Sequence, residues 1–422
     1  MKNLYNLSLL SFLLAFHMVF IGCKSNAEKE DLQEVDRTEV VMDGSVETLP
    51  REAVSQSPAF INQTRVPAIR SSTPYDVEVV ADHLSHPWGI TFLPDTRMLI
   101  SEKTGTIRII SLQGDVGDTI LGVPSVYYRQ DGGLMDITLD PDFQENRIVY
   151  WAFSEPYDTG YIASIAKGVL SPDESQFNNV EIIYRALPAV GGPMHYGVRL
   201  LFDVEDQLLV ALGERFEHRH RMKAQELDSP FGKIIRISGT GSPSIGNPYS
   251  NHPNALPEVY ASGFRDPQGL AFHPETGELW SSDHGTRAGD EINQISPGGN
   301  YGWPVIAYGL EYSREPINDG ITVKEGMEQP VYYWDPAIAP GGINFYSGIN
   351  IPEWKNNLFV AALKGKHLAR LVIEGGQVVA EERLLTELDH RLRSVIEGPD
   401  GNLYVLTDED QGMIVRIKKA AI

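Results

Sequence analysis

The residues of this chain best suited to chemistry are one histidine and four cations that lie far apart in the sequence. His195 stands in MHYGVRL, Arg265 in GFRDPQGL, Lys364 in AALKGK, and Arg391 and Arg393 in DHRLRSV. Guanidinium groups bind carboxylates through a planar fork of donors, and ammonium groups bind them as point charges. A neutral imidazole can accept a proton. If one fold brings these side chains together, they form a pocket that clamps a polycarboxylate beside one base.

Each of these residues also has a plain structural interpretation. A single histidine in a strand is more often structural than catalytic, and most Arg and Lys side chains carry solvated surface charge. The spacing of Arg391 and Arg393 favours binding, because residues two apart in a β-strand point to the same side and can converge on one ligand. For the other cations and for His195, residue type alone leaves both interpretations open.

A second chemical feature is the segment GTRAGDEINQISPGGNYGWP, which begins at Gly285. It combines a glycine-rich loop with the carboxylates of Asp290 and Glu291. Calcium takes oxygen ligands from carboxylates and from backbone carbonyls. The segment therefore indicates a calcium site, although a turn with a helix cap explains Asp290 comparably well.

A repeated β architecture must position these residues. From about Tyr75 to Arg416 the chain repeats an apolar strand, a Pro/Asp/Gly turn and a second apolar strand. The six copies are WGITFLPDTRMLISEKTGTIRII, GLMDITLDPDFQENRIVYWAF, GVRLLFDVEDQLLVALGE, GLAFHPETGELWSSDHG, INFYSGINIPEWKNNLFVAAL and VIEGPDGNLYVLTDEDQGMIVRI. Their alternation and turn residues are typical of hairpins, and their spacing, about 45 to 75 residues, is typical of propeller blades. We predict an all-β, six-bladed β-propeller with loop insertions, whose blades share one core around a central channel.

Composition limits the classes of function. With 422 residues, of which 42% are hydrophobic and 22% charged, the chain can bury a large core. The formal net charge of -22 argues against nucleic-acid binding, because phosphate contacts need a basic face. We expect a small-molecule substrate or protein partners instead.

The N-terminus has the order of an export signal. One Lys and a short apolar run end at a small residue before Cys23, the only cysteine of the chain. The sequence around Cys23 resembles a bacterial lipobox, with Phe20 where Leu is usual; the alternative is an inert thiol. We expect a lipoprotein-type signal peptide at 1–22, a flexible acidic spacer at 23–73 and a propeller domain at 74–422. The protein would then be lipid-anchored in the cell envelope, facing the periplasm, with the outer membrane favoured, or extracellular.

Eight strings together resemble a known family, the soluble quinoprotein aldose sugar dehydrogenases that use pyrroloquinoline quinone. They cover roughly residues 76 to 418 and stand in the family's order. The strings are HPWGITFLP, GGLMDITLDPDF, HYGVRL, GFRDPQGLAFHP, DHGTRAGDEIN, GGNYGWP, LFVAALK and RLRSVIEGPDGNLYVLTD. The resemblance implies a six-bladed propeller, in agreement with the repeat count.

The resemblance also implies a role for each candidate residue. His195 takes the position of the base that removes the C1 hydroxyl proton of an aldose, as glucose and related sugars are oxidised to lactones. The positions matching cofactor contacts are Asp131, Arg265, Asp266, Lys364, Arg391 and Arg393. One calcium ion would use the backbone carbonyls of Gly285 and Thr286 and polarise the quinone, and a second would use Glu291 and Tyr301. Electrons would leave to a respiratory acceptor.

Three positions depart from the family pattern. Asp131 replaces a Gln that borders substrate and quinone, Asp266 replaces a cofactor-contacting Asn, and Ala337 replaces a Thr that hydrogen-bonds the cofactor. A carboxylate beside an anionic cofactor is repulsive unless it is protonated or paired with a cation. A second hypothesis therefore stands beside the dehydrogenase: a cofactor-free propeller that binds sugar or protein without redox turnover. A lactonase-like calcium propeller would need a cluster of Asn, Asp and Glu ligands facing the channel, which the sequence does not offer.

Overall fold

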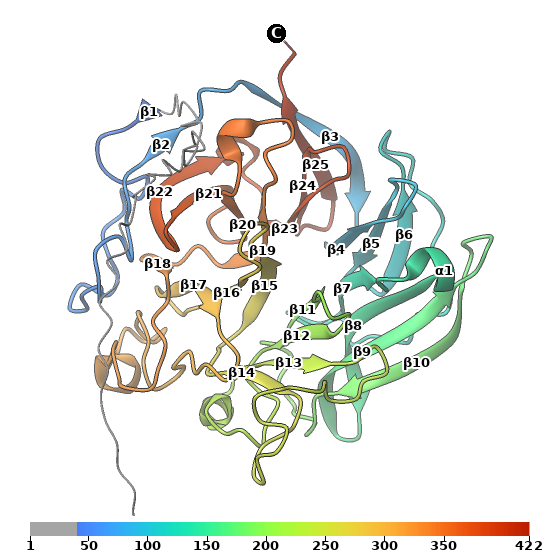
Figure 1. The fold of residues 1–422 in the computed structure, drawn as a ribbon, viewed down its shortest axis with the longest axis horizontal. Coiled ribbons are helices and arrows are strands. Elements are labelled where there is room, and N and C mark those ends of the chain that lie inside the picture. The colour runs from blue at the N-terminus through green and yellow to red at the C-terminus, as the bar shows by residue number, and fades with distance from the viewer. Residues whose placement is uncertain (1–39, 422) are drawn as a thin grey trace, which may run out of the picture. The chain divides into compact units, whose positions relative to one another are not determined.

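The computed structural model describes residues 40–421. They form six sheets arranged radially as the blades of a β-propeller, with a two-stranded sheet beside them (Figure 1). The predicted signal peptide, the predicted lipidation site Cys23 and residues 24–39 of the predicted spacer lie outside the described residues. Within residues 40–421, no helix is long and apolar enough to cross a membrane.

The first three blades follow one another along the chain. Each is an antiparallel meander in which sequential strands pair. Their strands are β4 (Pro87–Phe92), β5 (Met98–Glu102) and β6 (Thr106–Ile110) in the first; β7 (Leu134–Leu139), β8 (Ile148–Tyr157), β9 (Gly160–Leu170) and β10 (Phe177–Arg185) in the second; and β11 (Gly197–Phe202), β12 (Leu208–Leu212), β13 (Lys233–Ile237) and β14 (Val259–Ser262) in the third.

The other three blades repeat the pattern, and the last is closed by an N-terminal strand. Strand β3 (Tyr75–Leu84) pairs antiparallel with β25 (Gly412–Lys419), so the two ends of the propeller are joined in one sheet. The remaining strands are β15 (Pro267–Phe272), β16 (Leu279–Asp283), β17 (Asp290–Ile295) and β18 (Tyr332–Trp334) in the fourth blade; β19 (Pro340–Phe345), β20 (Leu358–Ala362), β21 (His367–Glu374) and β22 (Gln377–Leu384) in the fifth; and β23 (Leu392–Glu397) and β24 (Leu403–Thr407) in the sixth.

The predicted fold is confirmed, and each of the six repeats supplies the two innermost strands of one blade. These strands are buried on both faces for most of their length, because each blade packs between two others. The first strands of successive blades contact one another in a closed ring that returns from β23 to β4. Short helical turns occur only in loops: α1 (Phe143–Asn146), η1 (His218–Ala224), η2 (Ile317–Gly320), η3 (Pro352–Trp354) and η4 (Thr386–Leu388).

Residues 40–73 differ from the flexible spacer expected from the sequence. Strands β1 (Val40–Val41) and β2 (Ile69–Arg70) form the separate small sheet, and β2 contacts β22 of the fifth blade. Ala53 and Gln63 are 1% and 0% exposed. Polar composition misled the prediction because this segment is held by hydrogen bonds to the propeller rather than by a hydrophobic pattern of its own.

Candidate active site

A cavity of about 490 Å³ collects most of the predicted site residues. Its lining includes His195, Arg265, Lys364, Arg391, Arg393, Asp131, Asp266, Gly285, Thr286, Asp290 and Ala337. The other two predicted metal residues, Glu291 and Tyr301, line a smaller neighbouring cavity that also touches Gly285 and Thr286.

The blade architecture explains why residues so distant in sequence meet. His195 precedes β11, Arg265 and Asp266 precede β15, and Arg393 lies at the start of β23. Gly285 follows β16, and Lys364 follows β20. Because the first two strands of a blade are antiparallel, the start of one and the end of the next lie at the same edge. The site therefore occupies one end of the propeller.

His195 is held in a geometry that suits a base. Its Nδ1 lies 2.8 Å from Glu214 Oε1, and its backbone N–H donates to Asp131 Oδ2 at 3.0 Å. Burial, and then the charge of Arg265, lowers the pKa of His195 well below its usual value, so the ring is neutral. With the Nδ1 proton donated to the Glu214 carboxylate, Nε2 carries the lone pair.

Sequence reasoning missed Glu214. It follows β12, the strand paired with β11, and its side chain is fully buried. Burial raises its pKa to about 7, and its Oε2 has no hydrogen-bond partner in the described structure. The signal was weak, because LGERF carries no motif and only the strand pairing shows that Glu214 lies beside His195.

Of the four predicted cations, two make side-chain hydrogen bonds to other residues of the protein, and two make none within the described residues. Arg393 bonds to Gln268 Oε1 and to the Asp408 carboxylate, and its guanidinium lies over the Trp88 ring. Arg265 donates to the carbonyls of His284 and Gly285. Within residues 40–421, the Lys364 side chain has no hydrogen bond or ion pair, and the Arg391 guanidinium lies 4.0 Å from the carboxylate of Asp408. The Nε atoms of Arg265 and Arg393 are buried without a partner.

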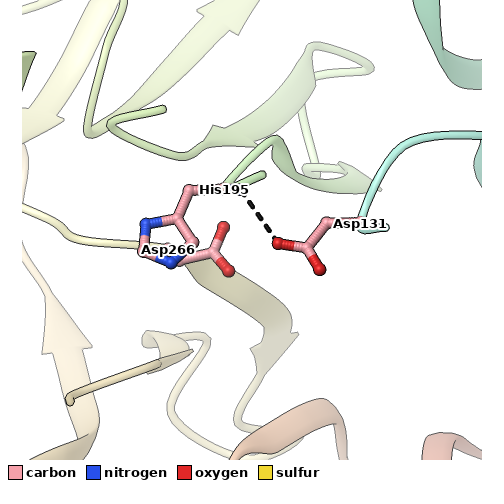
Figure 2. A group of neighbouring side chains, drawn as sticks. All are labelled: Asp131, His195 and Asp266. Atoms are coloured by element: carbon pink, nitrogen blue, oxygen red, sulfur yellow. Dashed lines mark hydrogen bonds between the residues drawn. The ribbon is translucent and has the colours of Figure 1, made fainter. Parts of the chain in front are cut away.

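Asp131, His195 and Asp266 form a cluster in the cavity, with one polar atom of each within 4.8 Å of the others (Figure 2). Asp266 accepts hydrogen bonds from Gly197 N and from Gln268 Nε2, both at 2.9 Å. Burial, and then the nearby charge of Asp131, raises the pKa of Asp266 to about 8. A raised pKa favours the protonated form of Asp266, which lessens the repulsion expected between its carboxylate and an anionic cofactor.

The residues predicted to bind calcium differ in the hydrogen bonds that they make. The carboxylate of Asp290 accepts backbone N–H bonds from Gly285 at 2.7 Å and from Ile338 and Ala339 at 2.6 Å, so it braces the loop. The Gly285 carbonyl accepts from Arg265, which would have to turn away for that oxygen to bind a metal.

Glu291 and Tyr301 border a different environment. Burial, and then the charge of Asp283, raises the pKa of Glu291 to about 8, and the pKa of Asp283 is itself raised to about 6 by burial. A divalent cation would relieve this crowding of buried carboxyl groups. The Tyr301 hydroxyl donates to Gln294 O at 2.7 Å, so the side chain is already engaged.

The fold and cavity together define a class: six-bladed propellers with a pocket lined by several cationic side chains and a neutral histidine. A family model described as Glucose / Sorbosone dehydrogenase matches residues 84–416. The chain belongs to this family.

Relatives of known structure or name agree with this assignment. Aldose sugar dehydrogenase YliI of Escherichia coli (strain K12) is 38% identical over 345 residues, which is 81% of this chain and 92% of the relative. A solved glucose dehydrogenase structure is 40% identical, with a TM-score of 0.79, and is matched over its whole length by 82% of this chain. The PQQ-bound form of the aldose sugar dehydrogenase from Streptomyces coelicolor is 27% identical, with a TM-score of 0.67 and the same coverage.

Proposed function

We propose that the protein is a quinoprotein that oxidises the C1 hydroxyl of aldose sugars to lactones, with pyrroloquinoline quinone as the hydride acceptor. The observation that carries the proposal is the pairing of neutral His195 with Glu214 beside a cavity that His195 and five cationic side chains line. The named relatives support the substrate class, and the PQQ-bound neighbour supports the cofactor.

The cavity fits a polycarboxylate. The Lys364 side chain has no ion pair in the described structure, and Arg391 has only a 4.0 Å contact with Asp408, so both can neutralise a ligand at little cost in internal ion pairing. Arg265 and Arg393 keep buried Nε donors free. Binding an anion there satisfies donors that are otherwise buried and unpaired. Bound pyrroloquinoline quinone would supply an acceptor for the hydride that leaves the sugar C1.

The protein's own residues would manage the proton. His195 lines the cavity, and its Nε2, the ring nitrogen not bonded to Glu214, would act as a neutral base and accept the proton of the C1 hydroxyl. The carboxylate of Glu214 at Nδ1 orients the ring and stabilises the imidazolium that forms. Asp131, bonded to the backbone N–H of His195, fixes the main chain that carries the base.

Calcium is part of the proposal. Gly285 and Thr286, whose backbone carbonyls are the proposed ligands, border the main cavity, and Glu291 borders the neighbouring one. Oxygen ligands of this kind suit calcium, which would polarise the bound cofactor at the first position and neutralise buried carboxylates at the second.

Dye reduction by the purified protein tests the function. We expect aldose-dependent reduction with pyrroloquinoline quinone and calcium, a loss of activity with a chelator, and a fall of at least about 100-fold in His195→Ala, because a positioned base contributes about that much. Turnover that persists unchanged in His195→Ala would reject His195 as the base.

A second candidate is a cofactor-free propeller that binds sugar or protein. The hydrogen bond from Arg265 to the Gly285 carbonyl favours it, because it occupies a proposed metal ligand. It predicts no binding of the quinone and no dye reduction at any calcium concentration.

The cellular setting is also a proposal. We infer that lipidation at Cys23 would anchor the protein in the cell envelope, where a respiratory acceptor would take the electrons. The sequence around Cys23 supports this, and labelling with a fatty-acid probe that is lost in Cys23→Ser would test it.

A further inference from the structure

Residues 40–73 form a strap that runs beside β18 and β22 (blue in Figure 1). The strap precedes the region matched by the family model, which begins at residue 84. Gln63 binds it to the fourth blade, since the Gln63 carbonyl accepts from Tyr333 N at 2.8 Å and the Gln63 side chain donates to Pro330 O at 3.0 Å. A parallel bridge between Ala68 and Glu381 binds it to the fifth.

One buried carboxylate fixes the strap where it passes the cavity. Asp335, whose side chain is 1% exposed, accepts from Arg51 Nε at 3.2 Å, from Glu52 N at 2.6 Å and from Ala53 N at 3.2 Å. Because two of these donors are backbone groups, the position of the chain at Glu52 does not depend on the Glu52 side chain.

The Glu52 side chain reaches the mouth of the cavity. Its carboxylate accepts two bonds from Arg287, at 2.8 Å from Nη2 and 3.1 Å from Nε, and lies 3.6 Å from Arg314. Glu52 and Arg287 both line the cavity, and their side chains are 24% and 25% exposed. The hydrogen bond with Arg287 lowers the pKa of Glu52, so the carboxylate is ionised.

The ion pair of Glu52 and Arg287 determines which charged groups an incoming sugar contacts at this part of the cavity. With Lys364 and Arg391 assigned to the cofactor, the bidentate fork of Arg287 is the remaining cation of the cavity lining that could bind a carboxylate on a substrate, and Glu52 already fills it. A sugar acid would therefore find Arg287 already paired and would be repelled by the Glu52 carboxylate. A neutral sugar carries no carboxylate, so the pair does not weaken its binding.

We propose that Glu52, supplied by the strap, is a specificity-determining residue that makes the cavity select neutral aldoses over aldoses that carry a carboxylate. The inference rests on the proposed function, because it concerns the sugar that this function oxidises.

The test compares D-glucose with D-glucuronate, which differ at C6 and share the C1 hydroxyl. In Glu52→Gln we expect the ratio of kcat/KM for glucuronate to that for glucose to rise about fivefold, the size expected for one partly exposed ion pair. The gain should vanish in Glu52→Gln combined with Arg287→Gln, which removes the freed fork.

Glu47→Gln is the matched control. Glu47 is another strap glutamate that pairs with an arginine, Arg383 at 2.9 Å, but it does not line the cavity. Its substitution should leave the ratio unchanged. A ratio that is equal in wild type and Glu52→Gln, or that rises as much in Glu47→Gln, overturns the proposal.

Calorimetric binding of both sugars to the full-length protein without added quinone gives a readout apart from turnover. We expect tighter binding of glucuronate in Glu52→Gln and no change for glucose. If the wild-type protein oxidises neither sugar, the proposed function fails and the binding ratio alone decides the role of Glu52. No difference between the variants, including no binding by any of them, counts against that role.

Discussion

At the scale of single residues, the central feature is a neutral histidine whose buried carboxylate partner titrates near neutral pH. Glu214 must be ionised to accept the Nδ1 proton of His195, and burial raises the Glu214 pKa to about 7. A carboxyl group with a raised pKa is charged only above that value. Activity should therefore be present above pH 7 and fall as the pH drops through it.

Glu214→Gln tests this coupling. The amide cannot stabilise the imidazolium, so we expect kcat to fall by about 100-fold, within the usual contribution of acid–base groups. The rising limb near pH 7 should disappear from the kcat profile, because the group that titrates is gone. A variant that keeps the limb would show that another residue controls the pH dependence, and Glu214 would then be only structural.

Lys364 offers a second test with a close control. It lines the cavity, whereas Lys366, two residues along, pairs with Asp389 at 2.9 Å and lies outside the cavity lining. We expect Lys364→Gln to weaken binding of pyrroloquinoline quinone by about tenfold, the value of one good charge-assisted bond, and Lys366→Gln to leave it unchanged. Fluorescence titration with the quinone measures both. Equal affinities in the two variants would remove Lys364 from the binding site.

At the scale of elements, the blades and the strap differ in how far the sequence predicts them. The six hairpin repeats match the six pairs of inner strands because alternation and turn residues are local signals. The closing strand β3 begins at Tyr75 and completes the sixth blade. The strap was missed because its stability comes from tertiary partners such as Asp335, which lies 283 residues from Glu52.

The site residues also divide into those that the sequence predicts and those that only the fold reveals. His195 and the four cations could be predicted as site candidates because they stand in strings that resemble a family, and one cavity brings them together. Glu214 and Glu52 could not, since each is defined by a partner that only the fold places beside it, His195 and Arg287 respectively.

The strap makes a prediction of its own. Asp335→Asn removes the charge that three donors share, so we expect the free energy of unfolding to fall by about 2 kcal/mol, the cost of breaking a buried charged hydrogen-bond group. Urea denaturation measures it. Asp206→Asn, at an exposed turn, should change stability by less than about 0.5 kcal/mol. A similar loss in both variants would show that Asp335 does not hold the strap.

At the scale of the whole molecule, a positive cavity sits in a protein of formal net charge -22. The cations of the cavity attract an anionic cofactor, and the net negative charge of the protein repels it. The salt dependence of the affinity shows which of the two effects is larger. If the local cations dominate, quinone affinity should fall as salt rises; we expect about a threefold loss between 0.05 and 0.5 M. Affinity that rises with salt would mean that the net charge of the protein repels the cofactor more than the cavity attracts it.

The most direct test of the account is a single turnover of the bound quinone, followed by its absorption. Wild-type protein loaded with pyrroloquinoline quinone and calcium should convert to the reduced spectrum when an aldose is added, whereas His195→Ala should hold the quinone with similar affinity and reduce it at least about 100-fold more slowly. A wild-type protein that binds the quinone but leaves it oxidised with every aldose, or that does not bind it, would contradict the central claim.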